Sequence, residues 1–200
     1  MYLAPAGAAD PIEGANPRVG DERVGATTSK SERCQECHGA DGNNENGQFP
    51  KLAGQQRTYI AKQLRDFQTG LRRHPIMTAM ADGLSEAQRF DIAAYFASRE
   101  QIRTRSPADP QVARELFERG DAERGIAPCA SCHGRDGRGQ NAETLVAPRV
   151  AGQHYFYLRA QLMDWRSGER RNSPGDVMNR TAERLDDGEI SALADYLSGL

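Results

Sequence analysis

The feature that most constrains this chain is a pair of five-residue motifs, each with two cysteines followed directly by a histidine. The motifs are Cys34-Gln35-Glu36-Cys37-His38 and Cys129-Ala130-Ser131-Cys132-His133. The chain contains 4 cysteines, and the two motifs use all of them. Two thiols three positions apart lie on one side of a helical turn, and the adjacent imidazole can reach over the group that they hold. The spacing is typical of covalent attachment of a c-type haem, with the histidine as an iron ligand.

We therefore predict two covalently bound haem c groups. Cys34 and Cys37 would hold the first haem and Cys129 and Cys132 the second, with His38 and His133 as iron ligands. The alternatives are a zinc site, a dithiol redox pair, or two coincidental cysteine pairs. A zinc site would have to join two cysteine pairs that lie 95 residues apart, and it would leave both histidines unexplained. A thioredoxin-like motif needs a βαβ unit that the sequence lacks.

The two motifs belong to a longer internal repeat. The segment Ala53-Gly54-Gln55 recurs as Ala151-Gly152-Gln153, and the pair Arg72-Arg73 recurs as Arg170-Arg171. The offset between matched residues grows from 95 at the motifs to 98 in these segments and to 101 near the end of each copy. Two insertions of three residues in the second copy, after the haem motif and after the arginine pair, account for the change. A repeat of this length predicts two copies of a small domain.

The repeat divides the chain into four parts. We expect a first domain over residues 29–103, a linker over residues 104–110 and a second domain over residues 111–200. Two prolines, Pro107 and Pro110, break helix in the linker. The preceding residues 1–28 are rich in Ala, Gly and Pro, so we expect an extended N-terminal extension there.

The pattern within each copy is helical, which predicts an all-α fold. Three stripes at helical spacing are expected to face the cores: Ile60, Leu64 and Phe67; Leu158, Leu162 and Trp165; Ile190, Leu193 and Leu197. Glycines follow the first two stripes and are expected to end their helices. Helix starts are expected at Ser29 with Glu32, Ser85 with Gln88, Asp109 with Pro110 ahead of Val112 and Leu116, and Asp186 with Glu189.

Composition excludes some function classes. With Lys+Arg at 26 and Asp+Glu at 28, the formal net charge is -2, so we expect no nucleic-acid partner. No run approaches the roughly 18 apolar residues needed to cross a bilayer. Residues 1–10 lack a charged segment followed by an apolar stretch, so no secretory signal is visible and a processed chain is one explanation.

The sixth iron ligand decides whether a haem carries electrons or binds a substrate. Met77 and Met178 are matched at the offset of 101, and we predict that they are the sixth ligands. Met80 is the fallback for the first haem, because its counterpart is a threonine. We expect Met163 to fill core or surface space. His74 and His154 would give bis-histidine sites, but neither is repeated, and we expect both at the surface.

Other repeated residues suggest supporting roles. The carbonyls of Pro50 and Pro148 could accept a hydrogen bond from the second nitrogen of each ligand histidine. Leu52 and Val150 would then cover the haem faces. The repeated arginine pairs could reach haem propionates or lie in a solvated loop.

Over residues 30–200 the chain resembles the cytochrome c4 family. The resemblance rests on the two-copy arrangement, the two cysteine-histidine motifs, an Asp-Gly pair shortly after each, the pattern P-x-(L/V)-A-G-Q, and a methionine ahead of L-(S/D). It implies two cytochrome c domains related by a pseudo-twofold axis, with iron held by His38 and Met77 and by His133 and Met178.

The resemblance also implies a function and a place. The protein would carry single electrons in the periplasm, from a quinol-oxidising complex toward a terminal oxidase, with possible peripheral association with the membrane. No residue would be catalytic, because no substrate bond is broken. The alternatives are an electron-accepting dihaem subunit of a dehydrogenase complex, and a dihaem enzyme with one open haem site, such as a peroxidase or a thiosulfate dehydrogenase.

Overall fold

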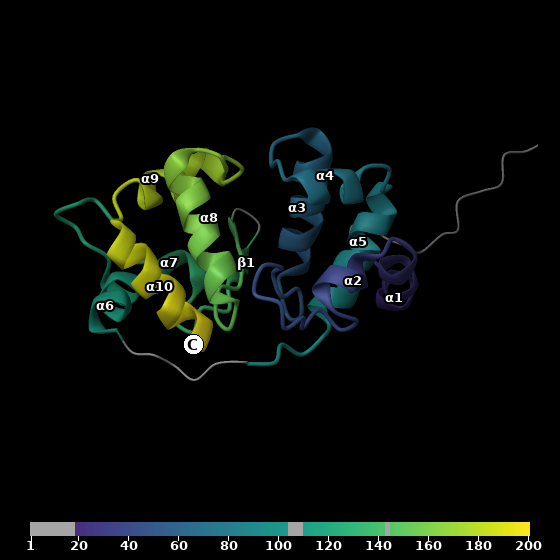
Figure 1. The fold of residues 1–200 in the computed structure, drawn as a ribbon, viewed down its shortest axis with the longest axis horizontal. Coiled ribbons are helices and arrows are strands. Elements are labelled where there is room, and N and C mark those ends of the chain that lie inside the picture. The colour runs from purple at the N-terminus through teal and green to yellow at the C-terminus, as the bar shows by residue number, and fades with distance from the viewer. Residues whose placement is uncertain (1–18, 104–109, 143–144) are drawn as a thin grey trace, which may run out of the picture.

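The computed structural model describes residues 19–103, 110–142 and 145–200 (Figure 1). In the described part the chain forms two helical halves that lie side by side, with α3 and α8 facing each other in the middle of the view. The predicted all-α fold is confirmed, apart from one short hairpin. Across these residues, no helix has the length and apolar character that crossing a membrane requires.

The first half contains α1 (Glu22–Ser31), α2 (Cys34–His38), α3 (Arg57–Thr69), α4 (Pro75–Ala81) and α5 (Glu86–Ala97). Its core lies between α3 and α5. The predicted stripe of α3 is buried, and Ile92 and Phe96 from α5 pack against it. The short helix α4, which the sequence did not predict, begins at a proline preceded by His74, whose Nδ1 accepts a hydrogen bond from the main-chain N–H of Met77 at 3.3 Å.

The second half repeats this order with additions. It contains α6 (Gln111–Arg119), α7 (Ala130–His133), β1 (Gln140–Ala142), β2 (Leu145–Ala147), α8 (Tyr155–Ser167), the 3-10 turn η1 (Pro174–Asp176), α9 (Val177–Ala182) and α10 (Asp187–Gly199). Ala113, Leu116 and Phe117 of α6 pack against the buried stripe of α10. Of the two apolar residues named for this helix, Leu116 is buried and Val112 is 55% exposed, so Val112 does not belong to the core face. Asp109 lies outside the described residues.

Helix ends follow the local sequence closely. Ser85 with Gln88 and Asp186 with Glu189 form the two predicted capping boxes, in which side chain and main chain satisfy each other reciprocally. Gly70 and Gly168 end α3 and α8 with φ of 74° and 80°, the left-handed conformation that glycine adopts without a steric penalty.

The expectation of an extended segment over residues 1–28 is wrong for its described end, because Glu22–Ser31 forms α1. Small residues explain the error, since α1 packs closely against α5 without large apolar side chains. A Cβ on Gly25 would lie 1.9 Å from the carbonyl oxygen of Asp91. Ser29 is fully buried in the last turn and its hydroxyl donates to the carbonyl of Ala26, so it does not start a helix with Glu32. Residues 1–18 lie outside the described part.

The two insertions of the second copy also have a structural form. The first becomes the antiparallel pair β1 and β2, in which Gln140 pairs with Ala147, although no strand was predicted there. The second becomes η1 ahead of α9. Insertions of three residues are thus absorbed as a hairpin and a turn, and the helices around them keep their order.

Candidate functional site

The motif cysteines lie on two short helices or directly before one of them, and the first cysteine of each motif packs on a core. Cys34 begins α2 and packs on the first core, while Cys129 directly precedes α7 and packs on the second. Burial raises the pKa of both thiols to about 11. Among the described residues, no three His, Cys, Asp or Glu side chains gather as a metal site, so the zinc alternative gains no support.

Each motif histidine is held by the carbonyl that the sequence predicted. Nδ1 of His38 lies 2.9 Å from the carbonyl oxygen of Pro50, and Nδ1 of His133 lies 2.9 Å from that of Pro148. A carbonyl can only accept, so each Nδ1 donates its proton and Nε2 keeps its lone pair free for a ligand bond. Burial lowers the pKa of both imidazoles, which favours the neutral form that binds iron.

Met77 lies on α4 and packs on the first core, as do Cys34 and Leu52. Met178 lies in the first turn of α9 and is half-buried, with its main-chain N–H donating to the hydroxyl of Ser173 at 3.2 Å. Met80 is half-buried near the end of α4. The predicted sixth ligands thus occupy short helices at equivalent points of the two halves.

Three other residues considered as ligands have structural roles. Met163 packs on the second core, as expected of a filling residue. His74 is exposed and caps α4, as expected of a surface residue. His154 is half-buried, contrary to expectation, because its Nε2 donates across the molecule to the carbonyl of Asn44 at 3.0 Å.

The first arginine of each repeated pair crosses between the halves. Nη2 of Arg72 donates to the hydroxyl of Tyr157 at 3.2 Å, and Nη2 of Arg170 donates to that of Tyr59 at 2.9 Å. Each guanidinium also stacks on an aromatic ring of its own half, at 4.8 Å on Phe67 and 4.3 Å on Trp165. The second arginine of each pair, Arg73 and Arg171, is exposed.

The role of several residues at the boundary between the two halves was not predicted from the sequence. Gln63 and Gln161 each accept hydrogen bonds from both crossing arginines. Gln55 and Gln153 bind main-chain groups of the opposite half. The signal was present in the sequence, because these side chains recur at an offset of 98 although they are polar and make no haem motif.

Some bonds across the boundary are made by residues of one copy and are not repeated by the matched residues of the other copy. Nζ of Lys62 donates to a carboxylate oxygen of Asp66 and to the carbonyl of Asn172. The side-chain amide of Asn172 donates to the same carboxylate at 2.5 Å. The positions that match Lys62 and Asn172 in the other copy are Ala160 and His74, which cannot build this arrangement.

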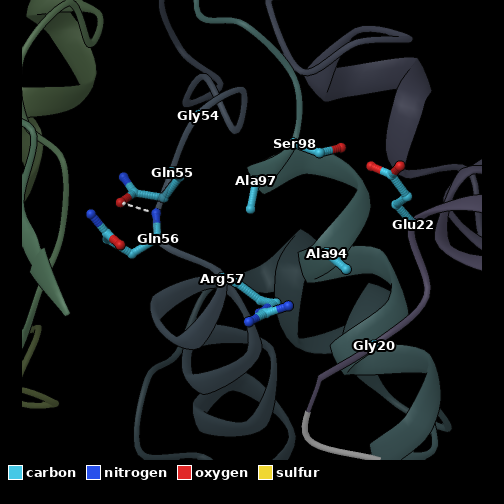
Figure 2. Close-up of a pocket in the computed structure, with 9 residues that line it drawn as sticks. All are labelled: Gly20, Glu22, Gly54, Gln55, Gln56, Arg57, Ala94, Ala97 and Ser98. Carbon is cyan, nitrogen blue, oxygen red and sulfur yellow. Dashed lines mark hydrogen bonds between the residues drawn. The ribbon is translucent and has the colours of Figure 1, made fainter. Parts of the chain in front are cut away.

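Figure 2 shows an open cleft of the first half that lies between the turn before α3 and the end of α5. Its lining residues are Gly20, Glu22, Gly54, Gln55, Gln56, Arg57, Ala94, Ala97 and Ser98. None of the predicted cysteine, histidine or methionine ligands lines this cleft, so it is separate from the candidate haem sites.

Taken residue by residue, both halves fit a covalently bound haem c. Each offers two thiols three positions apart, a neutral imidazole fixed through Nδ1, and a methionine on a short helix ahead of the last long helix. The apolar side chains of Leu52 and Val150 pack on the same cores as Cys34 and Cys129, and their covering of the haem faces stays a prediction.

Comparisons with known proteins point the same way. The sequence model of the family described as Cytochrome c matches residues 24–100 and again residues 117–200. A cytochrome c4 of Thiocapsa roseopersicina is 39% identical over 194 residues, which are 96% of this chain and 98% of that protein. A thiosulfate dehydrogenase electron acceptor of Stutzerimonas stutzeri is 40% identical over 173 residues, or 84% of this chain and 78% of that protein.

A solved structure is also similar. The crystal structure of reduced recombinant cytochrome c4 from Pseudomonas stutzeri superposes with a TM-score of 0.82 at 36% identity. The match covers 90% of this chain and 99% of that chain, so it includes both halves and their arrangement.

Proposed function

Because this chain belongs to the cytochrome c4 family, and is therefore a dihaem electron carrier with two covalently bound haem c groups, we propose that both of its irons have filled coordination. The ligands are His38 with Met77 and His133 with Met178. A filled coordination sphere leaves no position for a substrate, so the chain transfers electrons and catalyses no bond change of its own.

The observation that carries this proposal is the equivalence of the two sites. In each half, a proline carbonyl fixes the imidazole at 2.9 Å, and a methionine lies on the short helix ahead of the last long helix. When bound, each haem supplies an iron that alternates between the ferrous and ferric states. The two cysteines of each motif would hold the haem by thioether bonds, the proline carbonyl would fix the imidazole plane, and the packed core would keep water away.

The proposed boundaries of the two haem-binding units take account of α1. The first unit extends from α1 through residue 103, and the second covers residues 111–200, with residues 104–110 between them. Helix α1 belongs to the first unit because its glycine contacts the main chain of α5.

The proposed partners are a quinol-oxidising complex as donor and a terminal oxidase as acceptor, in the periplasm. Covalent attachment of haem to reduced cysteines takes place outside the cytoplasm, which supports this compartment. Exposed apolar side chains beside the predicted methionines, Ile76 at 50% and Val177 at 40%, support brief contact with redox partners. They occupy matched positions in the two halves, so each half offers its own contact surface.

A second candidate function rests on the similarity to the electron acceptor of thiosulfate dehydrogenase. In that case the donor is a dehydrogenase, and the chain passes on electrons from the oxidation of a small inorganic substrate. The ligand set and the chemistry of this chain are the same in both cases, and only the donor differs.

Rapid mixing of the oxidised protein with possible donors separates the two candidates. We expect membranes supplied with a quinol to reduce both haems, and membranes with a terminal oxidase to reoxidise them. Reduction by thiosulfate with a thiosulfate dehydrogenase, and none by the quinol-fed membranes, would favour the second candidate. Turnover of peroxide or thiosulfate by the purified protein alone would contradict the proposal that the chain is no enzyme.

A further inference from the structure

In the first half, one peptide group connects the motif histidine to a glutamine of the other half. Nδ1 of His38 donates to the carbonyl oxygen of Pro50 at 2.9 Å. The N–H of the same peptide group belongs to Lys51, and it donates to Oε1 of Gln153 at 2.8 Å. Two hydrogen bonds in series therefore run from the imidazole of the first half, through one peptide group, to a side chain of the second half.

The second half contains the same arrangement in reverse. Nδ1 of His133 donates to the carbonyl oxygen of Pro148 at 2.9 Å, and the N–H of Arg149 donates to Oε1 of Gln55 at 2.8 Å. Each glutamine also returns a bond, because Nε2 of Gln55 donates to the carbonyl of Arg149 at 2.9 Å. Nε2 of Gln153 does the same to the carbonyl of Lys51 at 2.9 Å.

The orientation of both glutamine amides is fixed by their surroundings. Oε1 of Gln55 accepts a second bond from the main-chain N–H of Gln56 at 2.9 Å, drawn as the dashed line in Figure 2. Oε1 of Gln153 likewise accepts from the N–H of His154 at 3.0 Å. The two side chains are 8% and 4% exposed, so water does not compete strongly for these groups. Main-chain N–H groups can only donate, and each amide must turn its oxygen toward them.

Bonds in series through a peptide group strengthen each other. When the N–H donates to an acceptor, electron density moves toward the carbonyl oxygen, which then accepts more strongly from the imidazole. A stronger bond at Nδ1 makes the imidazole a more basic ligand. A more basic ligand stabilises ferric over ferrous iron and lowers the reduction potential.

We propose that Gln153 lowers the reduction potential of the haem bound through His38, and that Gln55 lowers that of the haem bound through His133. Both are positioning residues, since they act through the Pro50–Lys51 and Pro148–Arg149 peptide groups. The effect is crossed, because each haem is tuned by a side chain of the other half. This inference rests on the proposed histidine ligands.

The test is a redox titration of the holoprotein and its Gln153→Met and Gln55→Met variants. Met77→His and Met178→His variants assign the two potentials, since each replaces one methionine by a histidine and lowers one potential. We expect Gln153→Met to raise the first haem's potential alone and Gln55→Met to raise the second's alone. At a fixed applied potential the ferric-to-ferrous ratio should fall about two- to fourfold, from the polarisation of a single hydrogen bond. For a one-electron couple this is a shift of about 20 to 35 mV.

Gln56→Met is the matched control for Gln55→Met. Gln56 also donates across the boundary, from Nε2 to the carbonyl of Arg138 at 3.0 Å, but it does not touch the Pro148–Arg149 peptide group. We expect this variant to leave both potentials unchanged. An equal shift in Gln56→Met and Gln55→Met would overturn the proposal, because loosening of the boundary would then explain the change.

A second measurement follows the bond itself. In the reduced protein, the Nδ1 proton resonance of His38 should move upfield in Gln153→Met, while that of His133 stays in place. A shift of the His133 resonance in Gln153→Met, or an equal shift of both reduction potentials, would contradict the crossed effect. The methionine-to-iron charge-transfer band of the oxidised wild type tests the ligand set separately. Its absence there would count against the proposed function.

Discussion

The loops that follow the two haem motifs begin alike and then differ at one matched position, Asn44 and Gly139. The main-chain N–H of both residues donates to the carbonyl of the motif histidine, at 3.1 Å from Asn44 and 2.7 Å from Gly139. Asn44 adds a side-chain amide that donates to the carbonyls of Phe49 at 3.1 Å and Pro50 at 3.3 Å. The first loop is therefore stabilised by a side chain.

The second loop is stabilised by the main chain of its hairpin. Gly139 has φ of 83°, and a Cβ there would lie 2.5 Å from the carbonyl oxygen of Ala147. Only glycine allows this approach, which brings β2 and the following Pro148 against the start of the loop. The two copies of one fold thus stabilise the loop that supports the motif histidine by different means, so we expect exchange of the matched residues to have unequal costs.

The largest expected effect concerns the methionine ligands, which are proposed to be equivalent in the two copies. Met77→Ala and Met178→Ala should each remove about half of the methionine-to-iron charge-transfer band, because each removes one of two sulfur ligands. Absorbance of the oxidised protein near its red edge measures this. Met80→Ala is the control and should keep the whole band. If Met80→Ala loses half and Met77→Ala loses none, the repeat alignment at α4 is wrong.

Exchange of the two loop residues should have unequal consequences. Gly139→Asn forces a side chain into a left-handed conformation and against the main chain of residues 147–149, so the free energy of unfolding should fall by about 3 kcal/mol or more. Asn44→Gly loses two side-chain hydrogen bonds and should cost about 1 kcal/mol. Denaturant titration of the holoproteins measures both. Equal costs would show that the loops are interchangeable.

The two crossing arginines should also differ. Arg170 is 5% exposed and donates to Asn172, Gln161, Tyr59 and Gln63. Arg170→Met should lower the free energy of unfolding by about 3 kcal/mol, because it removes four hydrogen bonds, and two of their acceptors, Asn172 and Tyr59, receive no bond from Arg72. Arg72 makes fewer of these bonds and is only partly buried, so Arg72→Met should cost about 2 kcal/mol. The same denaturant titration compares them, and a larger cost at Arg72 would contradict the assigned asymmetry.

The smallest expected effect concerns the first haem's potential. The amide of Asn44 shares the Pro50 carbonyl with His38, which weakens the bond to the imidazole. Asn44→Ala should lower the first haem's potential, with about a twofold or smaller rise in its ferric-to-ferrous ratio. The second haem serves as internal control in the same titration. A rise in the first potential would mean that Asn44 strengthens the histidine's bond.

The sequence was sufficient where a local rule acts alone. Cysteine spacing predicted the haem motifs, capping boxes predicted the starts of α5 and α10, and apolar stripes predicted the buried faces of α3 and α10. The support of His38 by Pro50 was also predictable, because a ligating imidazole needs an acceptor and the following loop repeats a proline.

The sequence was insufficient where burial depends on a neighbouring element. Helix α1 has no large apolar stripe, and Gly25 and Ser29 are buried only because the main chain of α5 lies against them. The boundary residues Gln55, Gln153 and Arg170 look like ordinary surface residues until the other half covers them. Their repetition was visible, but the contact that explains it joins residues about 100 positions apart.

The reciprocal contacts between the halves follow a twofold pattern. Gln55 meets Arg149 as Gln153 meets Lys51, and Arg72 meets Tyr157 as Arg170 meets Tyr59. Such exchange of equivalent partners is what a twofold axis imposes on two identical subunits. A single chain with two copies is free of that constraint, because a change in one copy is not repeated in the other. The one-sided contact of Lys62 and Asp66 with Asn172 is a kind of bond that two identical subunits around a twofold axis could form only in duplicate.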